Sequence, residues 1–258
     1  MRRSALVEPT SRLAVSSLWL TAIGIAVAVI AVLATRADWL DGGQAVLALA
    51  IGLGLIALSL LMALIAGAMI WVTGYRGARY AVAAALISVA ILAYPAALAV
   101  IGSRLPALND ITTDPSDPPA FDIVASARPA GANPSAYRPA LAELQRRLYP
   151  EIRPVEIDLP AEDVNELVTD MIDEKKWRIL DQVDFRGPQR EGRFELVTRS
   201  LVMGFRDDIV IRIRQVGPRA RIDIRSAARY GLQDFGVNAR RVITAIDELR
   251  TAARRAQR

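Results

Sequence analysis

Three long apolar runs occupy the first 101 residues of this 258-residue chain, and a sequence of mixed polarity follows them. The runs extend over 13–34, 44–72 and 80–101, and none of them contains Asp, Glu, Lys or Arg. A helix needs about 20 apolar residues to cross the hydrocarbon core of a bilayer, and each run is long enough. The pattern therefore predicts three transmembrane helices that form a membrane anchor over residues 1–101.

The first run fits either a cleaved signal peptide or a retained helix, because Arg2, Arg3 and Arg12 precede it. The apolar core of a signal peptide has roughly 7–15 residues, and this run is longer. The run also ends without a small-residue cleavage pattern, so we expect the helix to be retained. Gly24 and Ala28 share a four-residue spacing that lets helices approach closely, although alanine-rich runs produce this spacing by chance.

The arginines outside the runs predict the orientation of the anchor. The N-terminal tail carries three arginines and the second loop carries Arg76 and Arg79, whereas the first loop holds one Arg and two Asp. Short loops rich in Arg or Lys stay in the cytoplasm. Three crossings then place everything after residue 101 on the far side, which in a bacterium is the periplasm. We expect a multi-pass protein of the bacterial inner membrane, with the lipid bilayer as its first partner.

The spans themselves are predicted to be passive. Intramembrane ionisable residues mark ion paths and proton relays, and these runs contain none. A substrate path, or a surface on which a membrane partner docks, is the alternative.

The remainder of the chain divides into a linker and a domain. Seven prolines interrupt residues 102–139, which predicts an extended, semi-rigid periplasmic linker. Its Asn and Asp residues lack the spacing of a calcium loop. Residues 140–258 are predicted to form one periplasmic α+β domain, in which an antiparallel sheet packs against helices.

The elements of this domain follow from periodicity and from turn residues. Helices are expected over 140–148, from Pro160 onward, and after Asp234 to about residue 253. Extended segments are expected over 151–159, 177–185, 193–203, 208–214 and 219–226, with Gly217-Pro218 closing a hairpin. The predicted apolar face of the last helix is formed by Val237, Ile243, Ile246 and Leu249.

The hairpin over 208–226 has the clearest pattern of the domain. Isoleucines at 209, 211, 213, 222 and 224 alternate with charged residues. A period of two places the isoleucines on one face and the charges on the other, together with Glu195 and Arg199 of the preceding strand. We expect the charged face to be solvated and laced with cross-strand ion pairs. An Arg-lined surface for a carboxylate, phosphate or anionic lipid headgroup, or a protein-docking surface, are the alternatives.

The junction between the last strand and the last helix adds candidates for ligand binding. Asp234 or Asn238 is placed to cap the helix, and a helix N-terminus beside arginines can bind an anion. An ordinary strand–helix connection uses the same residue types. The candidate ligand-binding residues are Arg212, Arg214, Asp223, Arg225, Ser226, Arg229, Asp234 and Asn238.

Composition limits the chemistry that this chain can perform. The sequence has no Cys and no His, and its two lysines are Lys175 and Lys176. Thiol and Ser-His-Asp catalysis, ordinary zinc sites and His-ligated haem are therefore excluded within the chain. Asp207 and Asp208 are adjacent, so they point to opposite faces of a strand and are expected to serve the turn before it. We expect no catalytic residue, cofactor or metal.

Charge argues against a nucleic-acid partner. Residues 1–101 hold six arginines against three acids, and the remainder holds 26 cations against 24 acids. The outer domain is thus nearly neutral, and a nucleic-acid binder carries a basic patch or stripe.

Four segments resemble a known bacterial family, which is catalogued as domain of unknown function 1499. They are GRFE at 192–195, GFRDDIVIR at 204–212, RIDIRS at 221–226, and Arg229 followed by GLQDFGVNAR at 231–240. The chain is similar to the subgroup that has membrane helices before the domain. The resemblance implies a membrane-attached outer domain, and it implies no activity.

The leading hypothesis is a non-enzymatic inner-membrane protein whose periplasmic domain docks an envelope protein partner or an anionic lipid or metabolite. The first alternative is a carboxylate-dependent envelope hydrolase that uses Asp207, Asp208, Asp223 or Asp234. The second is an accessory subunit of a membrane transporter. The carboxylates of a glycosidase-type hydrolase lie about 5–9 Å apart on either side of one bond, so their arrangement separates these hypotheses.

Overall fold

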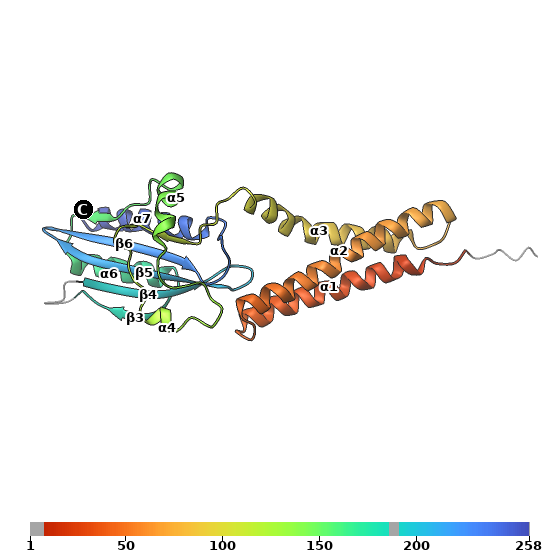
Figure 1. Ribbon diagram of the computed structural model, residues 1–258, viewed down its shortest axis with the longest axis horizontal. Coiled ribbons are helices and arrows are strands. Elements are labelled where there is room, and N and C mark those ends of the chain that lie inside the picture. Colours follow the sequence, from red (N-terminus) through yellow and green to blue (C-terminus); the bar gives the residue numbers. More distant parts are fainter. Residues whose placement is uncertain (1–7, 186–190, 258) are drawn as a thin grey trace, which may run out of the picture. The chain divides into compact units, whose positions relative to one another are not determined.

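The computed structural model describes residues 8–185 and 191–257 (Figure 1). The chain divides into two compact units, Met1–Arg104 and Leu105–Arg258. The first unit consists of three long apolar helices, and the second combines an antiparallel sheet with helices. The predicted fold class is confirmed.

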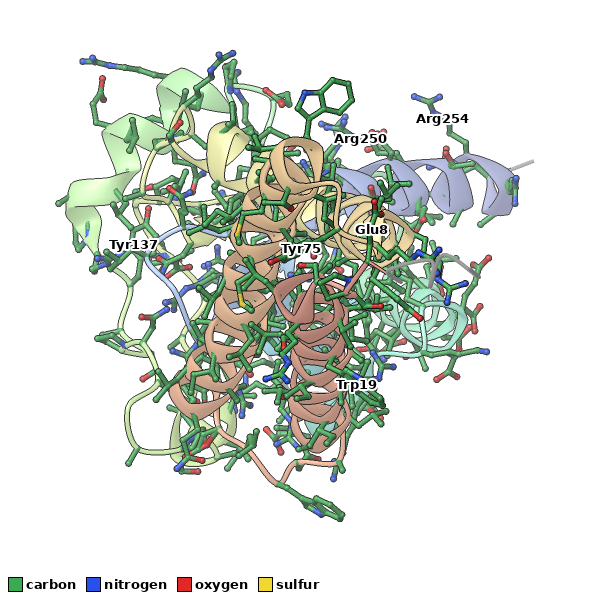
Figure 2. All side chains as sticks on the ribbon, turned by 90° about the vertical axis from the view of Figure 1, so that its right-hand side faces the viewer. Glu8, Trp19, Tyr75, Tyr137, Arg250 and Arg254 are labelled. Carbon is green, nitrogen blue, oxygen red and sulfur yellow. The ribbon has the colours of Figure 1, made fainter. Side chains whose placement is uncertain are left out.

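The first unit contains helices α1 (Arg12–Arg36), α2 (Gly42–Thr73) and α3 (Ala78–Gly102). All three are long and apolar enough to cross a membrane. Large apolar side chains such as Trp19 lie on their outer surfaces, 68% exposed in this case (Figure 2). A helix surface of this kind suits contact with lipid rather than with water.

Small residues allow α1 and α2 to approach closely. A Cβ atom added at Gly52 would lie 2.8 Å from the backbone nitrogen of Ala28, and one added at Gly24 would lie 2.7 Å from Ile56 Cγ1. The four-residue spacing of Gly24 and Ala28 therefore marks a real contact. Gly67 of α2 differs, because a Cβ atom added there meets nothing within 4 Å.

A cluster of buried hydroxyl groups joins the three helices. Thr21 Oγ1 lies 2.6 Å from Ser59 Oγ and 3.5 Å from Ser88 Oγ, and Ser59 donates to the carbonyl oxygen of Ser17. Hydrogen bonds of this kind contribute to helix association where the surrounding solvent is apolar.

The second unit is built on one antiparallel sheet in the order β1-β6-β5-β4-β3, with β2 also paired to β6. The strands are β1 (Asp110–Thr112), β2 (Val155–Ile157), β3 (Arg178–Val183), β4 (Glu191–Arg199), β5 (Arg206–Val216) and β6 (Arg219–Ala228). The helices are α4 (Ile123–Ser126), the 3-10 turn η1 (Pro139–Leu141), α5 (Ala142–Leu148), α6 (Ala161–Glu174) and α7 (Val237–Ala256). The predicted hairpin at Gly217-Pro218 joins β5 to β6.

The isoleucine face of the sheet forms the main core of this unit. Residues such as Ile211 and Ile224 pack against α6 and α7, which cover this face (Figure 1). In α7 the buried residues are Asn238, Ala239, Val242, Ala245, Ile246, Leu249 and Ala253. The prediction for Val237 was therefore wrong: it is the first helical residue and is 37% exposed.

The other face of the sheet carries the charges, and the chain around α4 covers it. Phe121 and Val124 pack against Val197, Val210 and Ala227 of this face. The segment predicted as a linker over 102–139 is therefore part of the domain from Leu105 onward, and its residues 110–112 form β1. This proline-rich segment is a layer that covers the sheet, and its contacts with the sheet fix it in place.

The prediction that the charged face is solvated was wrong, because the same segment covers it. Glu195, Asp223 and Arg225 are at most 1% exposed. Asp207 and Asp208 lie inside β5, where they pair with Thr198 and Val197 of β4, rather than in the turn before the strand.

Candidate functional site

Asp223 is the centre of the charged face. Its fully buried carboxylate accepts hydrogen bonds from three arginines of β5 and β6. Arg212 Nη2 lies 2.8 Å and Arg214 Nη2 2.6 Å from Oδ2, and Arg221 Nε lies 3.1 Å from Oδ1. The register explains the cluster, because Arg212 is directly opposite Asp223 and Arg214 is opposite Arg221. Both oxygens of Asp223 are thus occupied.

Two carboxylates of the covering segment balance these arginines. Asp117 Oδ2 accepts from Arg212 Nη2 at 3.0 Å and from Arg214 Nη1 at 2.9 Å, and Asp114 accepts from Arg221. Burial raises the pKa of Asp114, but hydrogen bonds from Ser116 and from the Asp117 amide, with the Arg221 charge, hold that pKa below its ordinary value. The covering segment is therefore held by ion pairs as well as by apolar contacts.

Arg225 forms a second buried ion pair with the start of the domain. Its Nε and Nη2 atoms lie 3.0 and 2.8 Å from the two oxygens of Asp110. It also donates to the carbonyl oxygens of Pro119 and Ser135, and its guanidinium lies 4.5 Å from the centre of the Phe121 ring. This arginine holds β1, β6 and the covering segment together.

Tyr137 lies beside this pair, with its ring centre 5.5 Å from the Arg225 guanidinium (Figure 2). Burial raises the pKa of its hydroxyl to about 12, and the Asp110 charge acts in the same direction. The hydroxyl is buried and has no hydrogen-bond partner among the described residues. It is therefore a protonated, structural group at neutral pH.

Asp208 is the third buried carboxylate of this face. Arg229 Nη2 lies 2.7 Å from its Oδ1 atom, and Arg128 Nε lies 2.8 Å from Oδ2. Two cations therefore share one carboxylate. Arg128 Nη2 is buried without a hydrogen-bond partner within the described part of the chain.

Glu195 is fully buried, and its carboxylate lies beneath α4. Its oxygens accept hydrogen bonds from the backbone amides of Asp122 and Val124 at 2.7–3.1 Å. The carboxylate thus satisfies amides that have no partner within the short helix.

Ser226 and Asn238 lie on the isoleucine face, at the start of α7. Ser226 Oγ lies 2.7 Å from Asn238 Oδ1, and Arg241 donates to both residues and to Asp207. Burial raises the pKa of Asp207 above its ordinary value, although Arg241 opposes this shift.

The carboxylate of Asp234 lies at the N-terminus of α7. Its oxygens accept from the amides of Gly236 and Asn238 at 2.9 and 2.7 Å. Asp234 is therefore the residue that caps this end, whereas Asn238 turns toward Ser226.

The structure thus divides the eight predicted residues between two faces of the sheet. Arg212, Arg214, Asp223, Arg225 and Arg229 form ion pairs on the charged face, and Ser226, Asp234 and Asn238 form hydrogen bonds beside α7. A ligand role for them stays a prediction, because their described contacts are all made within the chain.

A basic pocket of about 490 Å³ lies at the end of the charged face where β4 turns into β5. We call it the basic pocket. Its lining residues are Ala127, Lys175, Lys176, Arg178, Leu180, Val197, Thr198, Arg199, Arg206 and Arg229. Six of these ten side chains are cationic, and none is a carboxylate. The elements explain the gathering: Arg178 pairs with Val197, and Arg199 pairs with Arg206 across β4 and β5.

The basic pocket was not predicted from the sequence. The one sequence signal for this pocket is the adjacent pair Lys175-Lys176, which are the two lysines of the chain. The cations come from the segment after α6 and from β3, β4 and β5, which are apart in the sequence. The register of the strands brings them together.

At least two cations of the basic pocket are partly neutralised. Lys175 Nζ lies 2.6 Å from Glu248, and Arg229 is bound to Asp208. Lys176, Arg178 and Arg199 have exposed side chains, which can meet a ligand from solution.

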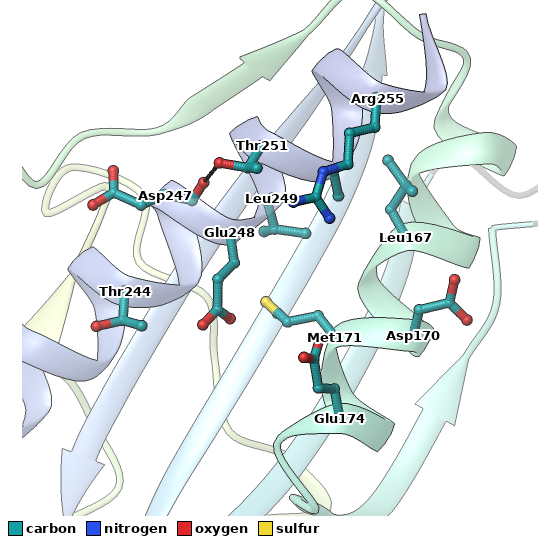
Figure 3. A pocket seen from close by; sticks show the side chains of 11 residues that line it. Leu167, Asp170, Met171, Glu174, Thr244, Asp247, Glu248, Leu249, Thr251 and Arg255 are labelled. Atoms are coloured by element: carbon teal, nitrogen blue, oxygen red, sulfur yellow. Dashed lines mark hydrogen bonds between the residues drawn. The ribbon is translucent and has the colours of Figure 1, made fainter. Parts of the chain in front are cut away.

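A second hollow of about 440 Å³ lies between α6 and α7 and is acidic (Figure 3). Its lining includes Asp170 and Glu174 of α6 and Asp247 and Glu248 of α7, with Arg255 near one end. Among the described residues, no group of three His, Cys, Asp or Glu is placed to hold a metal ion. Carboxylates along two neighbouring helices are typical of a solvated surface groove.

The fold defines a class: a membrane protein with three apolar helices followed by an α+β domain on an antiparallel sheet. The family model described as protein of unknown function (DUF1499) matches residues 110–249. Because this match covers more than half of the chain, the chain belongs to that family, as the resemblance predicted. The match begins at β1, inside the segment predicted as a linker. No curated protein and no solved structure matches the chain.

Proposed function

We propose that this membrane protein is a non-enzymatic anion-binding protein, and that its ligand binds in the basic pocket. The single observation that carries the proposal is the lining of that pocket, with six cations and no carboxylate. Arginine and lysine side chains bind phosphate and carboxylate groups through charge-assisted hydrogen bonds. The proposal keeps the anionic ligand predicted from the sequence, but it assigns that ligand to one end of the sheet instead of the middle.

The state of the acidic residues supports a non-enzymatic role. Asp207, Asp208 and Asp223 each bind at least one arginine, and Asp234 caps α7. None of the four lines the basic pocket or the acidic hollow between α6 and α7. A carboxylate hydrolase needs two carboxyl groups facing one substrate bond.

We further propose that the anion-binding domain lies in the periplasm of a bacterium, with the anchor in the inner membrane. Arg76 in the loop between α2 and α3, Arg79 in the first turn of α3 and the arginines of the N-terminal tail support this orientation. The ligand would then be an anion of the cell envelope rather than a cytoplasmic nucleotide or nucleic acid.

Binding of inorganic phosphate to the full chain in zwitterionic detergent tests the proposal. The variant Lys176→Gln/Arg178→Gln removes two of the three exposed cations of the pocket, and Arg199 is the third. Its matched control is Arg250→Gln/Arg254→Gln, which removes two exposed cations from α7 (Figure 2).

We expect the pocket variant to bind phosphate at least about tenfold more weakly, because a charged hydrogen bond contributes about 1.5–3 kcal/mol and a factor of ten corresponds to about 1.4 kcal/mol. The control should bind as the native chain does. Equal weakening in both variants would mean that phosphate responds to net charge alone, and the proposal would fail.

A further inference from the structure

We propose that the anion bound by the basic pocket is the headgroup of an anionic phospholipid in the bilayer that this chain itself spans, and that the apolar loops beside the pocket enter the membrane interface. The inference rests on the proposed function and names the ligand of the same pocket. Three observations carry it: exposed apolar side chains, the cations next to them, and the short covalent connection to α3.

The apolar side chains lie on two neighbouring loops, 200–205 and 230–232, which we call the apolar end loops. Leu201 is 91% exposed, Val202 51% and Leu232 73%. The rings of Phe205 and Tyr230 lie 6.2 Å apart and bring the two loops together. Large apolar side chains this exposed on adjoining loops mark an interaction surface.

The cations of the basic pocket border the first of these loops. Arg199 is the last residue of β4 and Arg206 the first of β5, so the two bracket the loop that carries Leu201. Apolar side chains beside Lys and Arg characterise protein surfaces that bind a membrane interface, where the apolar groups enter the acyl boundary and the cations meet anionic headgroups.

The covalent connection limits how far this surface can lie from the membrane. Asn109 Nδ2 donates to the carbonyl oxygen of Gly231 at 2.6 Å, next to Leu232. Asn109 follows Gly102, the last residue of α3, by seven positions. Seven extended residues span at most about 25 Å. The second apolar end loop is therefore tethered to the last residue of α3 by a short connection.

The opposite end of the sheet provides the contrast. Val216 is 52% exposed in the hairpin between β5 and β6, but its neighbour Arg219 is paired with Asp158 and Glu156. This hairpin combines an exposed apolar residue with a neutralised charge. It is the natural control site for the apolar end loops.

The absence of native cysteine allows a clean experiment on the full chain. Leu201→Cys and Val216→Cys each carry one environment-sensitive fluorophore, and the chain is reconstituted in nanodiscs of phosphatidylcholine, with or without phosphatidylglycerol. Lipids that carry a quencher near the headgroup report contact with the bilayer. Substitution at these exposed positions leaves the cores of both units intact.

We expect the label at position 201 to lose most of its fluorescence in nanodiscs that contain phosphatidylglycerol, and to recover it at high salt or in the Lys176→Gln/Arg178→Gln background. The label at position 216 should keep its fluorescence. Equal quenching at both positions, or quenching at 201 that survives the pocket substitutions, would overturn the inference.

The phosphate titration separates the two possible failures. If phosphate binds in the pocket but phosphatidylglycerol causes no quenching at position 201, the inference is wrong and the proposed function stands. If phosphate does not bind, the proposed function is wrong and the inference falls with it.

Discussion

The charged face of the sheet shows how single residues hold this domain together. Removing a carboxylate from water costs several kcal/mol, and this cost is offset only where its oxygens are fully hydrogen-bonded. Asp223 meets this condition with three arginines, and Glu195 meets it with backbone amides and Arg193. The buried carboxylates therefore hold the covering segment in one position on the sheet.

The substitution Asp223→Asn should strongly destabilise the outer domain. It leaves three guanidinium groups around a neutral amide, and breaking a buried ion pair typically costs about 3–5 kcal/mol. Hydrogen exchange in the full chain should show faster exchange throughout β5 and β6. Asp158→Asn is the control, because its carboxylate is 65% exposed and such pairs contribute under about 1 kcal/mol. Native protection in Asp223→Asn would contradict this account.

Asp114 should give the stability of the domain a dependence on acid pH. Its pKa in the folded chain is lower than the ordinary value of 3.8. The folded state therefore holds this proton less tightly than the unfolded state, so the stabilisation is present above pH 3.8 and is lost as the pH falls through the lowered pKa.

The melting temperature of the full chain should thus fall more steeply on acidification than that of Asp114→Asn. Circular dichroism melts at a series of pH values measure both slopes, and Asp158→Asn controls for the loss of one carboxylate. Identical slopes for the native chain and Asp114→Asn would show that this carboxylate has no such role.

Residue patterns predicted which side chains share a face but not their environment. Alternation correctly assigned Arg212, Asp223 and Arg225 to one face of the hairpin. It gave no sign of their burial, because the covering acids Asp110 and Asp114 lie 98 to 115 positions away in the sequence. A local period describes one strand, whereas burial depends on what packs against it.

At the scale of elements, α4 depends on a single strand residue. Glu195→Gln should loosen this helix, since an amide in place of the carboxylate sets an N–H group against the Asp122 and Val124 amides. An unsatisfied buried group costs about 1–3 kcal/mol. Hydrogen exchange over 121–127 should accelerate, while Glu191→Gln, an exposed position of the same strand, should leave it unchanged. Equal hydrogen-exchange rates in both variants would show that Glu195 does not stabilise α4.

The contact between α1 and α2 should tolerate no side chain at Gly52. In Gly52→Leu the new atoms meet the Ala28 backbone, so the helices must separate and break the Thr21–Ser59 hydrogen bond. We expect a lower melting temperature in detergent and faster exchange in both helices. Gly54→Leu is the matched control, because an added Cβ there meets nothing within 4 Å. A similar loss in both variants would point to helix propensity or to hydrophobicity instead.

Element prediction succeeded where a period was sustained and failed where a strand was short. The three apolar runs, α6 and the β5–β6 hairpin follow directly from their patterns. The strand β1 has three residues and lies among prolines, so the sequence around it resembles a linker. Its place in the sheet depends on pairing with β6, which no local pattern contains.

At the scale of the whole molecule, the two units place their charges differently. The anchor confines its arginines to the ends of apolar helices, while the outer domain buries several of its arginines against acids. Six cations of the domain gather in the basic pocket. The net charge of the domain does not indicate this pocket, because acids elsewhere in the domain nearly balance the cations.

The orientation of the anchor is the prediction on which the envelope location of the ligand depends. Arg76 in the loop between α2 and α3 and Arg254 on α7 are both exposed, and single cysteines at these positions are unique in the chain. A membrane-impermeant maleimide applied to bacteria with a permeable outer membrane should label Arg254→Cys at once, and Arg76→Cys only after the inner membrane is opened. Positive loops remain inside because lipid opposes their transfer. The reverse labelling order would place the domain in the cytoplasm and its ligand among cytoplasmic anions.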